Sequence, residues 1–252
     1  MNKKRRQTTE NAKPHRFKNT VINLFLILML IIGLALVFNN QIKYFLMGLN
    51  ANQYHISKVT ESKVKKNNDS AGNFDFSSVE PLSTEAVLEA QIANQNLPVI
   101  GGIAIPEINL NLPIFKGIDN TNLLWGAGTM KVDQKMGEGN YALASHYVAG
   151  QPKMLFSPLK EGPAQVGQKV YLTDTSNIYE YEITEVYEVS PDHGEVIDDI
   201  ENQKVLTLVT CSDANATNRV IVRANFEKSY SVADASQSVT NAFEQKYNQM
   251  TW

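Results

Sequence analysis

The chain has 252 residues, of which 43% are hydrophobic, and 23 basic against 26 acidic residues give it a net charge of −3. No basic block occurs outside the N-terminal tail, which argues against a nucleic-acid partner. A disulfide framework or a metal cluster is also disfavoured, because the chain holds one cysteine and no His/Cys group with the spacing of metal ligands.

Residues 21–38 form an apolar run of 18 residues that carries no charge and is interrupted only by Asn23. As a helix this run spans about 27 Å, close to the thickness of the hydrocarbon core of a bilayer. Residues 1–20 carry seven basic side chains and one acid, Glu10. The positive-inside rule therefore predicts a cytoplasmic tail at 1–20, a transmembrane helix at 21–38 and an extracellular remainder.

A cleaved signal peptide is the alternative interpretation of this N-terminus. Its apolar region would be about 7–15 residues long and followed by a cleavage site between small residues. The run here is longer, and residues 36–40 (LVFNN) offer no good cleavage site. We therefore expect an uncleaved, single-pass anchor in the cell membrane.

Residues 39–97 are predicted to form an extracellular stalk. Residues 57–73 are polar and rich in Lys, Asn and Ser, a composition typical of a flexible segment. Further on, Ser83 is a candidate helix cap, and Val87, Leu88 and Ile92 follow it at helical spacing. A short helix over 83–92 is expected to lead into the folded domain.

From residue 98 onward, short apolar runs alternate with turn residues every 8–12 positions, which is typical of an all-β domain. A closed or nearly closed barrel is the expected way to avoid long exposed strand edges. The residues from 98 to 252 are thus predicted to form one β-barrel domain with a helical C-terminal tail. The candidate strands are Gly102–Ile105, Leu112–Lys116, Tyr141–His146, Lys169–Thr173, Ile178–Val189, Val205–Cys211 and Arg219–Phe226.

The only cysteine, Cys211, closes an apolar, β-branched run and opens a polar loop. In an oxidising compartment such an odd cysteine indicates an intermolecular bridge or a free, reactive thiol. A cysteine nucleophile needs a partner such as His146 that favours the thiolate and later protonates the leaving amine. It also needs a donor such as Arg219 for the oxyanion of a tetrahedral intermediate.

Taken one at a time, these side chains have ordinary explanations. A lone cysteine in an apolar strand is often inert core, and a histidine at a strand end is often a satisfied surface residue. Arg219 alternates with Ile221 and Arg223, so an outward-facing cation on a half-buried strand is the default for both arginines. His193, in a turn-like segment, is interpreted as a bystander.

Three segments together resemble the signature segments of sortases, the membrane-anchored cysteine transpeptidases of Gram-positive bacteria. They are residues 207–211 (TLVTC), residues 217–222 (TNRVIV) and residues 142–146 (ALASH). Residues 125–129 (WGAGT) and 153–158 (KMLFSP) are similar to class A, the housekeeping type. The resemblance extends over roughly residues 75–250. It implies a mainly β fold, an eight-stranded sortase-type barrel with short helices, behind one N-terminal transmembrane helix.

The resemblance also implies the activity. Cys211 would attack the bond between Thr and Gly in an LPXTG-type sorting signal of a secreted surface protein. His146 would protonate the departing amine and then deprotonate the incoming one. Arg219 would hold the substrate backbone or the oxyanion, with help from a backbone N–H near Thr210. The amine of a cell-wall precursor, lipid II, would then resolve the acyl-enzyme and link the surface protein to peptidoglycan.

Residues that flank these segments are expected to bind the signal peptide. By the same resemblance, Ala144, Val209 and Thr210 border the peptide groove, and Leu123 and Met130 line the pocket for its apolar residues. The alternative for the four apolar ones is ordinary barrel core.

Two features depart from the family pattern or extend it. Tyr147 stands where many relatives have a second histidine, which puts an auxiliary role at that position in doubt. No cofactor is expected to be required, although some relatives bind calcium through acids in two loops. Asp133, Glu138 and Glu195 are the candidate ligands here, against the alternative of a solvated acidic surface.

Two other functions are weighed against a housekeeping sortase. A pilus-polymerising sortase would use a pilin lysine as the nucleophile. Such enzymes usually carry a lid before the barrel and often a second membrane span, whereas residues 243–252 are polar. A membrane-anchored binding domain without catalysis would have no need for Cys211, His146 and Arg219 together.

Overall fold

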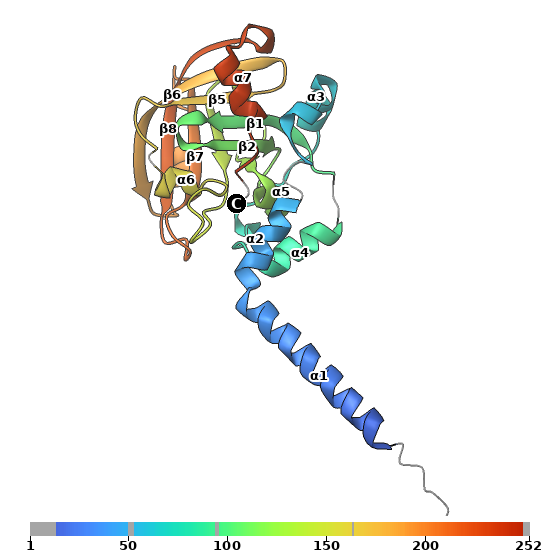
Figure 1. Ribbon diagram of the computed structural model, residues 1–252. Coiled ribbons are helices and arrows are strands. Elements are labelled where there is room, and N and C mark those ends of the chain that lie inside the picture. Colours follow the sequence, from blue (N-terminus) through green and yellow to red (C-terminus); the bar gives the residue numbers. More distant parts are fainter. Residues whose placement is uncertain (1–13, 50–52, 94–95, 163, 249–252) are drawn as a thin grey trace, which may run out of the picture. The chain divides into compact units, whose positions relative to one another are not determined.

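A computed structural model describes residues 14–49, 53–93, 96–162 and 164–248. Most of the predicted cytoplasmic tail (1–13) and the last four residues lie outside this range. Eight strands close into a barrel in the order β1-β2-β3-β4-β7-β8-β6-β5, which confirms the predicted fold class (Figure 1). The strands are β1 (Val99–Ile105), β2 (Leu110–Phe115), β3 (Ala127–Thr129), β4 (Asn140–Ala144), β5 (Lys169–Thr173), β6 (Asn177–Val189), β7 (Val205–Cys211) and β8 (Arg219–Ser231).

Most strands lie where the apolar runs predict them. β5 and β7 match their predicted bounds, whereas β1 and β2 each begin two or three residues earlier and β8 extends five residues further. The three-residue strand β3 was not predicted. β4 ends at Ala144, so His146 lies in the loop after the strand and not in it.

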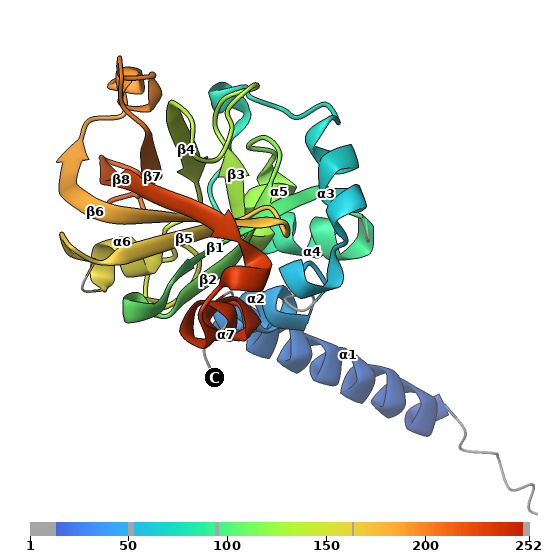
Figure 2. The ribbon, with the colours of Figure 1, turned by 90° about the horizontal axis from the view of Figure 1, so that it is seen from above.

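Strand pairing brings distant segments together at one side of the barrel. β4 runs parallel to β7, with Ala144 beside Val209. β7 runs antiparallel to β8, with Cys211 opposite Arg219. Figure 2 shows the barrel turned by 90°, with these strands in adjoining positions. The end of β4 therefore meets the end of β7 and the start of β8, which come much later in the sequence.

Short helices connect or precede the strands. The α-helices after the first are α2 (Asn39–Leu49), α3 (Glu61–Asn68), α4 (Thr84–Ala93), α5 (Asn120–Trp125), α6 (Ser157–Glu161) and α7 (Gln237–Glu244). Single 3-10 turns are η1 (Ile56–Lys58), η2 (Phe76–Ser78), η3 (Pro106–Ile108), η4 (Gly194–Ile197) and η5 (Val232–Asp234). The helix predicted over 83–92 is α4, one residue displaced.

The polar segment 57–73 is folded, not flexible as its composition predicts. Its helix α3 lies against β1, and Val64 is buried in that contact. Ile56 and Tyr54, just before it, are buried as well. Sparse apolar residues at the right positions therefore hold a mostly polar segment to the barrel, because each one buries its side chain fully.

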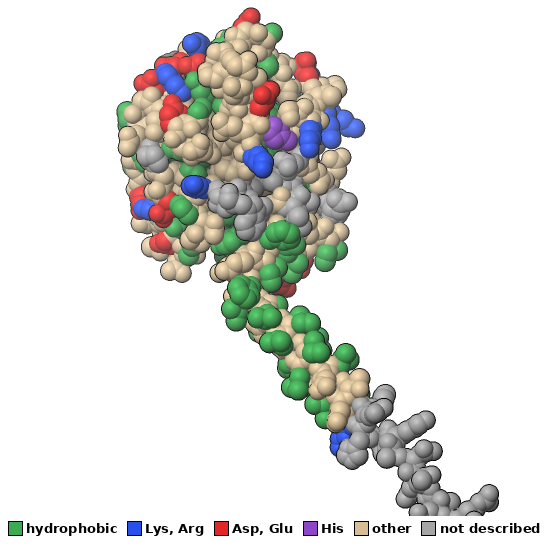
Figure 3. All heavy atoms as spheres, in the orientation of Figure 1, with side chains coloured by type: hydrophobic (Ala, Val, Ile, Leu, Met, Phe, Trp, Pro, Cys, Tyr) green, Lys and Arg blue, Asp and Glu red, His purple; other side chains and the backbone are tan. Residues whose placement is uncertain are grey.

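The N-terminal helix α1 (Pro14–Val37) belongs to a separate unit of the chain, which ends at Ile42. Within the described residues, one segment, Lys18–Val37, is long and apolar enough to cross a membrane. Its hydrophobic side chains are exposed (Figure 3). Exposed Leu, Ile and Phe around a whole helix are typical of a segment whose solvent is lipid.

Candidate active site

The strands β4, β7 and β8 carry two different apolar surfaces because successive side chains point to opposite faces. On β7, Leu206 and Leu208 point into the barrel and belong to its main core. Val209, one residue further, belongs to a second cluster on the outer face. The members of that second cluster are Ile118, Leu123, Met130, Ala142, Val209 and Ile221.

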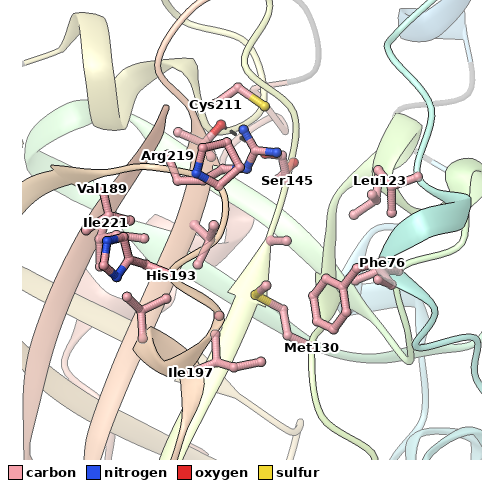
Figure 4. Close-up of a pocket in the computed structure, with 18 of the residues that line it drawn as sticks. Phe76, Leu123, Met130, Ser145, Val189, His193, Ile197, Cys211, Arg219 and Ile221 are labelled. Atoms are coloured by element: carbon pink, nitrogen blue, oxygen red, sulfur yellow. Dashed lines mark hydrogen bonds between the residues drawn. The ribbon is translucent and has the colours of Figure 1, made fainter. Parts of the chain in front are cut away.

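A cavity of about 560 Å³ lies over this second cluster (Figure 4). Its lining comes from β4, β7 and β8, from the loop between β6 and β7, and from the segment around η2. Cys211, His146 and Arg219 all line it. So do the five residues expected to bind substrate: Leu123, Met130, Ala144, Val209 and Thr210.

Cys211 is the last residue of β7, and Arg219 is the first of β8. They form a directly opposed pair in the antiparallel ladder, on the outer face. Such pairs hold their Cβ atoms about 5 Å apart, within reach of a long side chain. Figure 4 shows both side chains at the same end of the cavity. The register of two strands therefore suffices to bring a guanidinium to the thiol.

The Arg219 guanidinium is held by the loop that joins the two strands. Its Nη1 donates to the carbonyl oxygens of Ala216 at 2.9 Å and Asn218 at 3.2 Å. Within the described part of the chain, the Arg219 side chain makes these two hydrogen bonds. Nε and Nη2 thus remain able to donate to a ligand.

The loop itself is ordered by short-range hydrogen bonds. The Oδ1 atom of Asp213 accepts from the backbone N–H groups of Asn215 at 2.8 Å and Thr217 at 3.1 Å. Ser212 and Asn218 then close the loop through the Ser212 N–H to the Asn218 carbonyl at 3.0 Å. An Asx turn of this kind fixes a loop without secondary structure.

The thiol of Cys211 is partly buried, and this burial raises its pKa above the ordinary thiol value. The positive charge of Arg219 opposes that shift, and the carboxylate of Asp213 adds to it. Desolvation dominates because a thiolate loses more hydration than a thiol. The free protein therefore holds Cys211 mainly as the neutral thiol at neutral pH.

His146 follows β4 in a loop that is tied on both sides. Before it, Ser145 donates its N–H to Val209 at 3.2 Å and its hydroxyl to Gly126 at 2.7 Å. The Thr210 hydroxyl donates to the Ser145 carbonyl at 2.9 Å. After it, the His146 carbonyl accepts from the N–H of Phe156 at 3.2 Å. The backbone around the imidazole is thus anchored to the strand that carries the thiol.

Burial lowers the pKa of His146 from 6.5 to about 4. Surrounding protein atoms replace water and disfavour the charged imidazolium. Among the described residues, no hydrogen bond joins this imidazole to the Cys211 thiol. The resting pair is therefore neutral on both sides, and proton transfer between them awaits closer contact, as is common in ligand-free sites.

The four apolar residues expected to bind substrate are not inner barrel core. Ala144, Val209, Leu123 and Met130 belong to or pack against the outer cluster, beneath the cavity. The Thr210 side chain points to the opposite face of β7, where its hydroxyl donates to the Ser145 carbonyl. These positions give the cavity an apolar floor with a polar end.

The end of β6 at Val189 and the following loop, through Val196 and Ile197, form one wall. Arg223 holds it from outside by donating to the Val196 carbonyl at 3.2 Å, and Asn140 donates to that same carbonyl at 3.1 Å. Arg223 also lies 3.7 Å from Glu185 and over the Tyr187 ring. The default interpretation of an outward-facing cation thus describes Arg223, whereas Arg219 faces the cavity.

His193 lines the rim of the cavity but is exposed. Its Nδ1 lies 2.6 Å from Glu195, and that carboxylate raises the pKa of His193. Tyr147, at the position after His146, donates its hydroxyl to Glu161 at 2.7 Å. Neither side chain is directed to the thiol by these bonds.

The three calcium candidates do not form one ligand set. Asp133 and Glu138 border a small hollow together with Lys131 and Lys135, and Lys135 lies 3.8 Å from Glu138. Glu195 is paired with His193 instead. Within the described ranges, no group of three His, Cys, Asp or Glu side chains is placed to hold a metal. The acids present do not fit the six to eight oxygens that calcium takes.

Sequence patterns missed part of the lining. Phe76, Ser77 and Val79 reach the cavity from the segment predicted as a stalk. They follow a polar region and show no strand or helix period, so their position could not be predicted from the sequence.

Comparisons with known proteins show the family of the chain. A family model of the sortase domain matches residues 103–227. The chain is 52% identical to sortase A of Streptococcus agalactiae over 94% of its length and 97% of that protein. It is 36% identical to sortase A of Listeria monocytogenes over 88% of its length and 95% of that protein.

A solved structure gives the same result at the level of the fold. The crystal structure of Listeria monocytogenes sortase A has a TM-score of 0.54 and 38% identity to this chain, with 59% of this chain and 99% of that one covered. Sequence identity of this extent over nearly the whole length shows common descent. The chain therefore belongs to the sortase family and is a cysteine transpeptidase of the sortase A type.

Proposed function

We propose that Cys211 is the nucleophile with which this housekeeping sortase cleaves LPXTG-type signals and anchors surface proteins to the cell wall. The observation that carries the proposal is that eight residues from separate segments line one cavity, with Cys211 directly opposite Arg219. An inert core cysteine would not be expected to share a cavity with His146 and Arg219.

The first half-reaction begins when Cys211 loses its proton to His146. The thiolate adds to the threonine carbonyl carbon, and the carbonyl oxygen becomes an oxyanion. Arg219 is placed to donate Nε–H or Nη2–H to that charge, as in other acyl-transfer sites. His146 returns the proton to the glycine nitrogen as the C–N bond breaks. The product is a thioester between Cys211 and the threonine.

The second half-reaction reverses these roles. The incoming amine attacks the thioester carbonyl, His146 takes the amine proton, and the Cys211 sulfur leaves as a thiolate that is reprotonated. The amine is that of a cell-wall precursor, for which lipid II is the proposed carrier. No oxidant or metal is needed, because both steps are acyl transfers.

The neutral resting pair has a consequence for this cycle. The Cys211 thiol has a raised pKa and the His146 imidazole a lowered one, so the thiolate–imidazolium pair is a minor species in the free protein. A peptide that covers the cavity brings the two groups together and adds dipoles around the charges. Substrate binding is therefore proposed to promote activation of the thiol.

Anchoring supports the same function. The span Lys18–Val37 is proposed to keep the barrel at the outer membrane surface, with the N-terminus in the cytoplasm. Exported surface proteins and lipid-linked precursors are found at that surface, so the tether raises the effective concentration of all reactants. Labelling of Cys211, the only thiol, by a membrane-impermeant maleimide on intact cells tests this topology.

The turnover assay uses the full chain in detergent or vesicles, an LPXTG-containing peptide and a glycine oligomer, with products read by mass spectrometry. We expect a product in which threonine is linked to the added amine, and its complete loss in Cys211→Ala. Residual turnover in that variant would refute the nucleophile. Replacing the glycine oligomer with a lysine-bearing pilin peptide tests the pilus-polymerising alternative, in which the lysine would be the preferred amine.

A further inference from the structure

Phe76 is a large aromatic side chain that the structure leaves half exposed, at 50%, inside the proposed substrate cavity. It lies on η2, outside residues 103–227, which match the sortase domain. Figure 4 shows its ring in the cavity beside Met130 and away from Cys211. An apolar ring exposed in a groove is a typical binding surface.

The turn that carries Phe76 is held in place by hydrogen bonds. Asp75 caps η2 by accepting from the N–H of Ser77 at 2.9 Å. Asn73 donates its side-chain amide to the Ser78 hydroxyl at 3.0 Å, and its carbonyl accepts from the Ile118 N–H at 2.8 Å. The turn is therefore closed on itself and tied to the loop that follows β2.

A second connection ties the turn to α5. The Asn120 side chain accepts from the N–H of Glu80 at 2.8 Å and donates to the Ser78 carbonyl at 3.1 Å. Leu123, one helical turn further along α5, lies in the cavity floor. Val79 packs against the same outer cluster. Phe76 is consequently held at a defined position relative to the floor.

The length of the signal places its leucine away from the thiol. In an extended peptide each residue advances about 3.3 Å, so a leucine three residues before the threonine lies roughly 10 Å from it. The polar end of the cavity holds Cys211 and Arg219, and the apolar end holds Met130, Leu123 and Phe76 (Figure 4). A bound LPXTG peptide with its threonine at Cys211 would bring its leucine to the apolar end.

We propose that Phe76 forms a wall of the leucine subsite and makes this sortase selective for a large apolar residue at that position. The inference rests on the proposed function and adds a specificity-determining residue from a segment outside the barrel. Contact with leucine would bury both the exposed ring and the ligand side chain, and burial of apolar surface is the term that distinguishes leucine from alanine.

Two peptides test the proposal on the full-length protein, one with LPXTG and one with alanine in place of the leucine. We expect Phe76→Ala to lower kcat/KM roughly tenfold for the LPXTG peptide, mainly through KM, the scale seen when a pocket loses apolar contacts. For the alanine peptide we expect less than a twofold change, because the lost contact is already absent. The kcat/KM of Phe76→Leu for the LPXTG peptide should lie between those of the wild type and Phe76→Ala.

Phe45→Ala is the matched control, because Phe45 on α2 has the same exposed fraction of 50% and does not line the cavity. This variant should leave kcat/KM unchanged for both peptides. Equal losses for both peptides, or none, in Phe76→Ala would overturn the inference. Faster turnover of both peptides would also overturn it, because Phe76 would then obstruct the cavity. If wild type processes neither peptide, the proposed function fails instead.

Discussion

The two faces of β4, β7 and β8 differ although the same strands build both. The inner face carries Leu143, Leu208 and Val222, all fully buried in the main core. The outer face also has an apolar floor, but Cys211 and Arg219 stand at its end. A shift of one residue along a strand exchanges the faces. Stability and reactivity are therefore assigned to alternate positions of the same short strands.

Separate substitutions of two adjacent residues of β7, one on each face, test this division most directly. Leu208→Ala should lower the free energy of unfolding by about 3 kcal/mol, because a fully buried leucine leaves a cavity in the core. Val209→Ala removes less volume from the outer cluster and should cost about 1 kcal/mol. Urea unfolding of both variants checks the values.

Peptide kinetics then separate the two positions. Val209→Ala should raise KM for the LPXTG peptide, since Val209 lines the cavity, whereas folded Leu208→Ala should keep its KM. A larger loss of stability in Val209→Ala than in Leu208→Ala would contradict the assignment of faces.

Arg219→Lys tests the polar end of the outer face. A lysine keeps the charge but loses the planar set of N–H donors, so we expect kcat/KM to fall about a hundredfold, as for loss of one oxyanion donor. The melting temperature should change little, because the site lies outside the main core. Steady-state kinetics with the LPXTG peptide measure the effect.

Arg223→Lys is the control for Arg219→Lys, because Arg223 lies four residues further along β8, on the same strand face, and holds the Val196 loop from outside. Its effect on kcat should be small. Equal effects of the two lysine variants on kcat would mean that Arg219 only supports the loop.

The partly buried imidazole of His146 predicts a pH dependence of stability. His146 is held neutral in the fold, with a pKa of about 4, whereas the unfolded chain binds a proton below 6.5. Stability is therefore fully present above pH 6.5 and falls as the pH drops toward 4. Between pH 7 and pH 5 the loss should be about 2 kcal/mol.

His146→Gln isolates this contribution, because glutamine does not titrate. Urea unfolding of both proteins at pH 7 and pH 5 should show a steeper loss in the wild type, by about 2 kcal/mol. Parallel losses in the two proteins would show that His146 is solvated and not buried.

The fold could be predicted from the sequence where a run of apolar and β-branched residues is bounded by polar or turn residues. β5 and β7 follow their predicted bounds because both of them are runs of this kind. β3 was missed since its three residues, Ala127–Thr129, are too short and small to show a period. The folded segment 57–73 was missed because single apolar residues such as Val64 hold it by tertiary contact, which local composition does not reveal.

The site could be predicted only as a set of candidates. Spacing and residue type singled out Cys211, His146 and Arg219, and the resemblance to a family joined them. The register that sets Cys211 opposite Arg219 is a property of the folded pair of strands. Phe76 had no such signal, because its place depends on the long-range bonds of Asn73 and Asn120.

The smallest expected effect concerns the charge next to the thiol. The Asp213 carboxylate raises the pKa of Cys211, so Asp213→Asn should lower that pKa and raise the thiolate fraction at neutral pH. We expect iodoacetamide to alkylate Cys211 roughly threefold faster in this variant, since a nearby like charge disfavours the anion. Asparagine keeps the Oδ1 acceptor that orders the loop through Asn215 and Thr217.

Asp213→Ala separates charge from loop structure. It removes the same charge but also the acceptor, so the loop that holds Arg219 should loosen and kcat should fall, while kcat of Asp213→Asn stays near that of the wild type. Slower alkylation in Asp213→Asn would mean that loop geometry, and not charge, controls the thiol. Faster alkylation at unchanged stability would show that a surface loop controls the reactivity of Cys211 on the outer face without affecting the core beneath it.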